Sequence, residues 1–177
     1  KAPWITRKLA EARERHARQE GARIDWRDGV TVPYLGGVIA VHLDPGHSFT
    51  AVGAQLDCTP GADAAEGEVV QRLRIGLPRS ATPEQIRDAV QAWLMRQAKA
   101  HFTLRLDHFA PLLQVQWKRL SLSNASTRWG SARIDGAIRL NWRLIHCTPA
   151  VVDYVVAHEL SHLLVMDHSA QLWQTGE

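Results

Sequence analysis

The stretch VVAHELSHLLVMDH, Val155–His168, contains the pattern H-E-x-x-H followed six residues later by another histidine. On an α-helix, residues four positions apart lie on the same side, so His158 and His162 point the same way. Two imidazoles so placed can chelate one zinc ion, and Glu159 lies at the flank of that face, within reach of a metal-bound water. Zinc lowers the pKa of that water towards about 7, Glu159 accepts its proton, and the hydroxide attacks a carbonyl. The stretch predicts a helix with a hydrolytic zinc site.

The third zinc ligand constrains where this helix ends. Catalytic zinc has three protein ligands and one open position, and His168 is the candidate for the third. An uninterrupted helix would carry position 168 roughly 240° around from His162, on the wrong side. Val165, at the position where metzincin proteases have glycine, resists positive φ, whereas Asp167 tolerates it better. We therefore expect the helix to end near Met166 and the chain to turn at Asp167.

The residues before the stretch predict where its helix begins. Thr148 is a candidate N-cap, and Pro149 suits the first helical position, where no N–H is needed. The other interpretation of the stretch is an amphipathic helix whose histidines are merely exposed or hydrogen-bonded. The helix start, the apolar lining and the third histidine together favour the zinc site.

Residues 127–145, TRWGSARIDGAIRLNWRLI, are typical of a β-hairpin that turns at Asp135-Gly136. A two-residue turn would pair Trp129 with Trp142. The same register puts three arginines together on the face opposite the apolar residues, and these are Arg128, Arg139 and Arg143.

Four residues near the predicted zinc site are candidates for binding substrate, and they are Arg128, Asn141, Arg143 and Tyr154. The three hairpin residues project from its non-core side. They are equally expected to be solvated residues of the sheet without a role in binding. Tyr154 lies one turn before His158 on the same side, so it could donate a hydrogen bond near the oxyanion, although core packing is the favoured role for it.

The earlier part of the chain divides into three regions. Residues 1–21 are typical of a basic helix. Residues 23–46 contain short β-prone runs separated by glycine-rich turns, as in a meander, and residues 50–80 are expected to form further strands around a loop. Thr82 then acts as N-cap, with Pro83 at the first helical position and Gln85 three residues after the cap, so a helix is expected from there to about Leu104 or Leu106. Residues 112–120 are expected to form a strand.

The composition limits the class of protein. The chain has 177 residues, of which 45% are hydrophobic and 22% charged, as in a globular protein. It has no apolar run long enough to cross a membrane and no signal-peptide pattern, so we expect a cytoplasmic protein without a membrane partner. Its two cysteines, Cys58 and Cys147, are far apart and indicate neither a disulfide framework nor a thiolate zinc site.

The segments RWGSARIDGAIRLNWRLI and TPAVVDYVVAHELSHLLVMDHSAQLW resemble the YgjP-like metallopeptidase family. Its members show R-W-G-S-C, I-x-L-N-W, P-x-x-x-x-D-Y-V-V-x-H-E-L-x-H and N-H-S-x-x-F/W. The resemblance is specific over residues 127–173 and weaker over VPYLGG and the helix of residues 83–106. Two positions depart from the pattern: Ala132 replaces the cysteine after W-G-S, and Asp167 replaces the asparagine before the third histidine.

The resemblance implies an α+β, zincin-like fold in which a mixed or antiparallel sheet lies beside the H-E-x-x-H helix, after a small β-rich segment. It implies His158, His162 and His168 as zinc ligands and Glu159 as general base. We expect an N-terminal basic helix over 1–21 and a single metallohydrolase domain over 22–177. Within that domain, residues 22–80 would form a β-rich lobe, and residues 81–177 a lobe with the long helix, the hairpin and the zinc site.

Three functions compete. The leading hypothesis is a zinc-dependent metallopeptidase that binds a peptide or protein substrate along an edge strand formed by residues 137–144. An alternative is a metal-dependent nucleoside triphosphate (UTP) pyrophosphatase, an activity also associated with this family, in which the hairpin arginines bind phosphates. A second alternative is a nucleic-acid-associated module with structural zinc and a basic N-terminal helix. A structural site normally has four protein ligands and needs no Glu159, so the pattern favours an enzyme.

Overall fold

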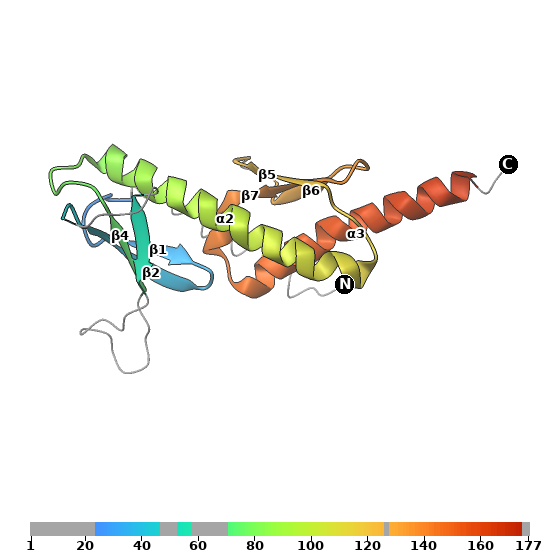
Figure 1. Ribbon diagram of the computed structural model, residues 1–177, viewed down its shortest axis with the longest axis horizontal. Helices are drawn as coiled ribbons and strands as arrows, with labels where there is room; N and C mark the ends of the chain where they lie inside the picture. The colour runs from blue at the N-terminus through green and yellow to red at the C-terminus, as the bar shows by residue number, and fades with distance from the viewer. Residues whose placement is uncertain (1–23, 47–52, 58–70, 126–127, 175–177) are drawn as a thin grey trace, which may run out of the picture. The chain divides into compact units, whose positions relative to one another are not determined.

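The computed structural model describes residues 24–46, 53–57, 71–125 and 128–174, and side chains in the last helix as far as Val165 (Figure 1). The predicted N-terminal helix over 1–21 lies outside the described residues. Contacts divide the chain into two compact units. Unit 1 runs to Leu94 and includes residues 146–148, and unit 2 holds Met95–Ile145 and everything from Pro149 onward. The predicted domain boundaries stay a prediction.

Unit 1 is built on a four-stranded sheet with the strand order β1-β2-β4-β3. The strands are β1 Thr31–Tyr34, β2 Gly37–Leu43, β3 Ala54–Asp57 and β4 Gln71–Ile75. Strands β1 and β2 form a tight antiparallel hairpin in which Tyr34 pairs with Gly37. Leu35 (φ 46°) and Gly36 (φ 83°) both have positive φ, as a type I′ turn requires.

Beyond this hairpin the strands do not follow a simple up-and-down order. Strand β2 pairs with β4 in parallel, and β3 pairs antiparallel with the other side of β4. The alternation of side chains is the same in both arrangements, so the sequence pattern does not distinguish them. Ile39, Val41, Leu73 and Ile75 are almost fully buried and form the core face of this sheet.

Helix α2 spans Pro83–Leu113 and begins as predicted. The backbone N–H of Gln85 donates to Oγ1 of Thr82 at 3.2 Å, and the N–H of Thr82 donates to Oε1 of Gln85 at 2.9 Å, which is a reciprocal capping box. The boundary between the two units falls within this helix, between Leu94 and Met95.

The predicted end of α2 at Leu104 or Leu106 is wrong, because the helix continues to Leu113. It ends in a Schellman motif: Gln114 has φ 57°, its N–H donates to Pro111 O at 3.2 Å, and the N–H of Val115 donates to Ala110 O at 3.1 Å. Ala110 and Val115 are both buried, which supplies the apolar contact of that motif. The strand expected over 112–120 therefore starts later.

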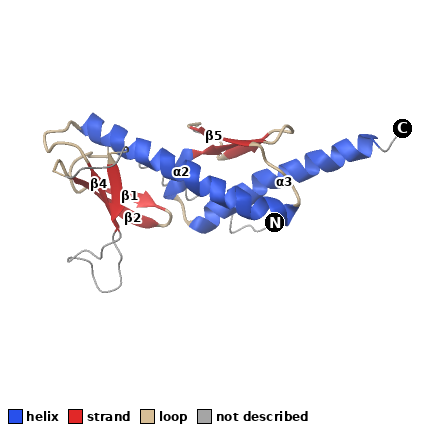
Figure 2. Cartoon of the chain, viewed as in Figure 1, coloured by secondary structure: helices blue, strands red, loops and turns tan. Residues whose placement is uncertain are grey.

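Unit 2 contains a three-stranded mixed sheet with the order β5-β7-β6, drawn red in Figure 2. Its strands are β5 Arg119–Ser123, β6 Gly130–Ala132 and β7 Ala137–Asn141. Strand β7 pairs in parallel with β5 and antiparallel with β6. A short 3₁₀ helix, η1 Trp142–His146, leads into α3, Pro149–Gln174, which contacts β6 and β7. A mixed sheet beside the H-E-x-x-H helix confirms the predicted α+β class.

The β6–β7 hairpin has a longer loop than predicted. The N–H of Arg133 donates to Ala137 O at 2.9 Å, and the N–H of Gly136 donates to Arg133 O at 3.0 Å. Gly136 has φ 89°, so the loop is a three-residue turn that ends in a glycine bulge. The register is displaced by one residue from the predicted one.

The displaced register changes the predicted partners. Gly130 pairs with Leu140 and Ser131 with Arg139, while Trp129 O accepts from the N–H of Asn141 at 2.8 Å. The predicted pairing of Trp129 with Trp142 is wrong. Strand β7 is the middle strand of this sheet, so the prediction of an edge strand over 137–144 is wrong as well; β5 and β6 are the edges.

Helix α3 begins at Pro149 as predicted, but it does not end near Met166. It runs to Gln174, so the predicted turn at Asp167 is wrong. After Pro149 the helix contains neither proline nor glycine, and a single aspartate costs too little helix propensity to stop it. The backbone of His168 is therefore helical; side chains after Val165 lie outside the described part of the chain.

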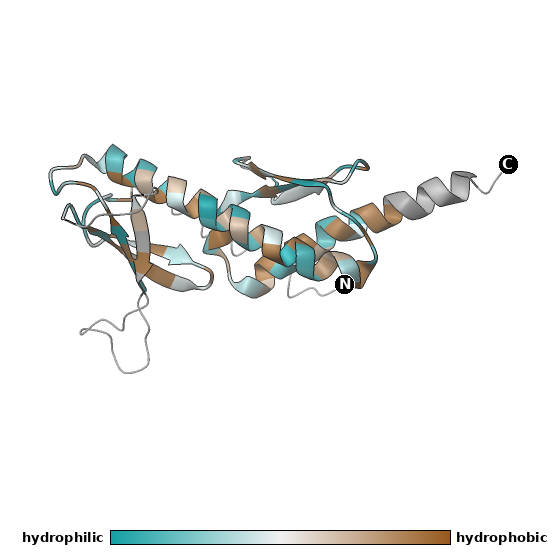
Figure 3. Ribbon diagram, viewed as in Figure 1, coloured by the Kyte–Doolittle hydropathy of each residue, from teal (hydrophilic) through white to brown (hydrophobic). Residues whose placement is uncertain are grey.

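Apolar residues are distributed along α2 and α3 in a mixed pattern, brown and teal in Figure 3. Among the described residues, no helix is both long and apolar enough to cross a membrane.

Candidate metal centre

Helix α3 is anchored in unit 2 by one apolar side. Val152, Val156, Leu160 and Leu163 are buried against the core, whereas His158 and His162 are exposed. The three-to-four-residue spacing of the apolar positions fixes the rotation of the helix about its axis. The two histidines are consequently held side by side at the surface.

The two imidazoles are arranged as a pair of metal ligands would be. Their Nε2 atoms lie 3.2 Å apart and their rings are nearly perpendicular, at 85°. Two nitrogens bound to one tetrahedral zinc ion at about 2.05 Å each would be roughly 3.3 Å apart. Donor atoms of His158, Glu159 and His162 all lie within 4.8 Å of one another, and no other such trio of side chains occurs among the described residues. The donor set and its spacing fit a divalent metal.

Glu159 is the buried member of this group, with 7% of its surface exposed. Burial raises its pKa above the usual range, because the charged carboxylate loses hydration; the positive charges of His158, His162 and Arg128 oppose this rise. A buried carboxylate beside two imidazoles suits a group that takes and returns a proton.

Gly130 brings strand β6 into direct contact with Glu159. A β-carbon at this position would lie 3.0 Å from Cγ of Glu159, 3.0 Å from Cδ2 of Leu140 and 3.1 Å from Arg139 O. Contacts this short are tighter than nine in ten β-carbon contacts in proteins, so a larger residue here would have to displace its neighbours by a few tenths of an ångström. The sequence contained this residue in its W-G-S segment, but nothing in the spacing revealed its contact with a residue far along the chain.

Tyr154 lies where the helix predicts, one turn before His158. Its ring stacks on the imidazole of His158, with centroids 5.9 Å apart and planes 28° from parallel. The side chain is half-buried, so it both packs against the helix surface and borders the metal group. This contact restricts the rotation of the His158 ring.

Asn141 does not project from the exposed side of the hairpin as predicted. It is only 4% exposed, and both ends of its amide are occupied. Its Nδ2 donates to Ala125 O at 2.7 Å and to Arg128 O at 3.3 Å, and its Oδ1 accepts from the N–H of Arg143 at 3.0 Å. Asn141 therefore holds the segment that leads to Arg128.

The three arginines predicted to share one face occupy different settings. Arg128 is exposed and acts electrostatically on Glu159. Arg139 is exposed on β7. Arg143 belongs to η1 instead of the strand; its Nη1 donates to Asn124 O at 3.4 Å and its guanidinium lies 5.3 Å from the centre of the Trp142 ring.

An ion pair that sequence reasoning did not find joins α2 to α3 within unit 2. Nε and Nη2 of Arg105 donate to the two carboxylate oxygens of Asp153 at 2.6 and 2.9 Å. The bidentate pair fixes the start of α3 against α2, one to two turns before the metal group.

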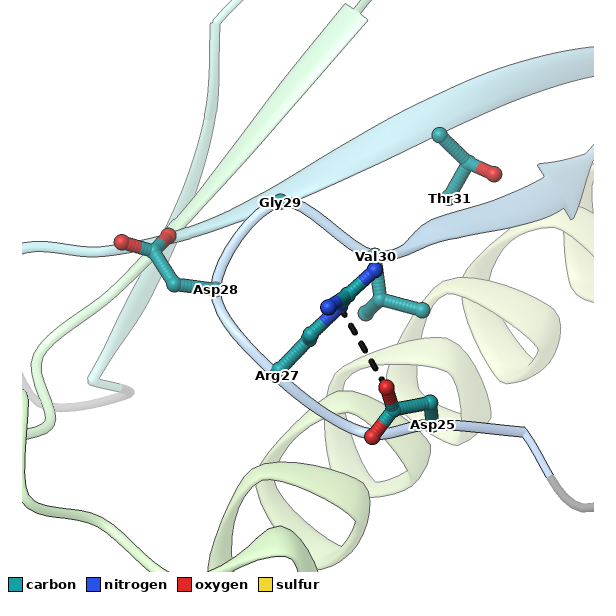
Figure 4. Close-up of a pocket in the computed structure, with 6 residues that line it drawn as sticks. All are labelled: Asp25, Arg27, Asp28, Gly29, Val30 and Thr31. Atoms are coloured by element: carbon teal, nitrogen blue, oxygen red, sulfur yellow. Dashed lines mark ion pairs between the residues drawn. The ribbon is translucent and has the colours of Figure 1, made fainter.

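Unit 1 contains a separate hollow of about 400 Å³, shown in Figure 4. It is lined by Asp25, Arg27, Asp28, Gly29, Val30 and Thr31. Nε of Arg27 lies 3.4 Å from Oδ2 of Asp25, and Oδ1 of Asp28 accepts from the N–H of Leu43 at 3.1 Å. The charged groups of this hollow are thus engaged with neighbouring groups of the protein.

A model of the YgjP-like, metallopeptidase domain family matches residues 1–177. Comparison with curated proteins and with solved structures gave no match.

Proposed function

The chain belongs to the YgjP-like metallopeptidase domain family, and from this membership we propose that it is a zinc-dependent peptidase with Glu159 as its general base. The observation that carries the proposal is the pair of Nε2 atoms 3.2 Å apart beside a buried carboxylate. A structural zinc site would not require that carboxylate, and it normally uses four protein ligands.

His158 and His162 would hold the metal. When bound, the metal ion supplies Lewis acidity, which lowers the pKa of a water molecule and polarises the scissile carbonyl. Glu159 accepts a proton from the attacking water and returns it to the leaving amine. Its burial strengthens its interaction with the transferred proton, and Gly130 keeps its side chain in one place.

His168 is proposed as the third ligand. In a continuous α3 this position lies roughly 240° around the helix axis from His162, so ligation requires the helix to open between them. Binding of the metal would supply the free energy for that local change.

The free edge of β6 is proposed to bind the substrate backbone. Residues 133 and 129 of the hairpin are hydrogen-bonded to 137 and 141, so by alternation Gly130 and Ala132 direct their N–H and C=O groups away from β7. An extended peptide could pair with these groups as an added strand. Because Gly130 contacts Glu159, such a peptide would pass beside the general base.

Arg128 and Tyr154 are proposed to contact the substrate next to the metal group. Arg128 already acts electrostatically on Glu159, and Tyr154 stacks on His158. The side-chain amide of Asn141 donates to Arg128 O and accepts from the N–H of Arg143, so it positions the backbone at both arginines.

The test combines metal analysis with hydrolysis. We expect the purified full chain to bind one zinc ion and to cleave unstructured proteins, and Glu159→Gln to retain zinc but lose activity by about 10² to 10⁴-fold, the usual contribution of a general base. His108→Gln, an exposed histidine change in α2, serves as the matched control. Failure to bind zinc, or an unchanged rate in Glu159→Gln, would refute the proposal. Hydrolysis of UTP without cleavage of any protein would instead favour the pyrophosphatase alternative.

A further inference from the structure

The outer face of the unit 2 sheet, which is the side away from α3, presents one row of three residues. Ser121 of β5, Arg139 of β7 and Ser131 of β6 are paired across the strands. The neighbouring residues of β7, Ile138 and Leu140, face the opposite side and are buried. Arg139 is thus the exposed central side chain of this row, between the exposed Ser121 and the half-buried Ser131.

The segment that forms this sheet concentrates positive charge. Residues 114–146 contain six cationic residues and one carboxylate, a net charge of +5 in a chain whose total is +3. The cations are Lys118, Arg119, Arg128, Arg133, Arg139 and Arg143, and the carboxylate is Asp135. An anionic ligand is therefore favoured along this sheet.

Arg139 is the arginine of this face that remains available. Arg119 and Arg133 both lie near Oδ2 of Asp135, at 2.9 and 3.8 Å, so their charge is partly neutralised. Within the described residues, Arg139 has neither an ion pair nor a side-chain hydrogen bond. Its guanidinium is free to bind a carboxylate from outside the protein.

A peptide added along β6 would bring its own side chains next to this row. Adjacent strands are about 4.8 Å apart, so the added strand would lie roughly 10 Å from the backbone of β7. Ser131 stands between the two, and its short side chain leaves room for the long Arg139 side chain to reach across. The substrate side chain opposite Ser131 would point to the outer face, while its two neighbours would point towards α3.

We propose that Arg139 selects substrates with an aspartate or glutamate at the position that faces Ser131. The substrate class is therefore an extended peptide with an acidic side chain one strand position away from those that face the metal group. This assignment rests on the proposed peptidase function and on β6 as the strand that binds the substrate.

The test uses the zinc-loaded full chain and a set of short peptides in which one position at a time is Asp, Ala or Lys. The wild type should prefer Asp over Ala at one position by about two- to fivefold in kcat/KM, the range expected for an exposed charge pair. Added salt should weaken this preference. Arg139→Lys should keep it, and Arg139→Glu should reverse it in favour of Lys. Arg87→Glu, a charge reversal on α2 in unit 1, should leave it unchanged.

A second measurement separates binding from chemistry. Affinities of the same peptides for Glu159→Gln and for the double variant with Arg139→Glu should show the same reversal. Cleavage with no charge preference, or a preference that survives Arg139→Glu, would overturn the role of Arg139 while leaving the peptidase intact. A zinc-loaded chain that neither cleaves nor binds any peptide of the set would overturn both the role of Arg139 and the peptidase function.

Discussion

Gly130 and Glu159 are in such close contact that a β-carbon on Gly130 would lie 3.0 Å from Cγ of Glu159. We expect Gly130→Ala to cost about 1–3 kcal/mol of folding free energy, as overpacking usually does. It should also lower activity, because Glu159 must move to make room. Urea denaturation and peptide hydrolysis measure the two effects.

The matched control is Gly37→Ala, in the first position of β2. A β-carbon there would meet Tyr34 O at 3.6 Å, which is an ordinary contact. Equal losses of stability and activity in both variants would show that the contact between Gly130 and Glu159 has no special role.

Glu159 should destabilise the metal-free fold at neutral pH. Its pKa is raised in the folded state, so the folded chain holds the proton more tightly than the unfolded chain does. This contribution to the free energy of unfolding is fully present below the unfolded pKa of 4.5 and is lost as the pH rises through the folded pKa. Glu159→Gln should therefore unfold at a higher temperature than the wild type at pH 7, with the difference shrinking as the pH approaches 4.5. Thermal unfolding in a chelator, followed by circular dichroism across this range, tests the sign; a less stable Gln variant at pH 7 would contradict it.

Asn141 should matter for stability as well as for activity. Replacement by alanine leaves the backbone carbonyls of Ala125 and Arg128 without their donor, and it removes the acceptor of the Arg143 N–H. A loss of about 1–3 kcal/mol is expected, because three hydrogen bonds worth about 0.5–1.5 kcal/mol each are removed. Asn124→Ala is the comparison, because Asn124 is exposed although its Oδ1 accepts from Nε1 of Trp142. A smaller loss in Asn141→Ala than in Asn124→Ala would contradict this role.

His101 should make the fold sensitive to mild acid. Burial lowers its pKa below 6.5, while Asp153 raises it and Arg105 lowers it further; its Nε2 has no hydrogen-bond partner among the described residues. The unfolded chain then binds the proton more readily than the folded chain does. The free energy of unfolding is therefore highest above pH 6.5, where His101 is neutral in both states, and it falls as the pH drops below 6.5. His101→Gln should flatten this decline in urea titrations. A decline as steep as that of the wild type would place its origin elsewhere.

Metal binding should raise the thermal stability. At a free zinc concentration one hundred times the dissociation constant, the folded state gains about 2.7 kcal/mol. Both His158→Ala and His162→Ala should lose this gain, whereas His108→Ala should retain it. Unfolding temperatures with and without zinc, measured by scanning calorimetry, decide the question; a gain that persists in the two α3 variants would place the metal at other residues.

Local signals in the sequence predicted local structure well. Thr82 with Gln85, and Thr148 with Pro149, located the starts of both long helices, because capping depends on residues within one turn. The side-by-side placement of His158 and His162 followed from helical spacing alone. These features need no knowledge of the rest of the chain.

Features that depend on distant contacts were not predictable in the same way. The Asp135-Gly136 pair is compatible with a two- or a three-residue loop, and the burial of Ile138 and Leu140 accompanies the longer one. The position of β7 between β5 and β6 requires a parallel pairing across residues far apart in the chain. The turn at Asp167 was inferred from what His168 needs in order to bind metal, but helix propensity in this segment favours continuation.

The hydrogen bond between Nδ1 of His146 and Pro33 O, 2.7 Å long, joins residues 113 positions apart and belongs to unit 1. A growing chain leaves the ribosome from its N-terminus, so this hydrogen bond to the first sheet forms only after the whole β5–β7 segment has been synthesised. Closing so long a loop is slow compared with forming a helix or a hairpin. The strands of unit 1 are therefore synthesised before those of unit 2, but the contacts of unit 1 are completed only after them.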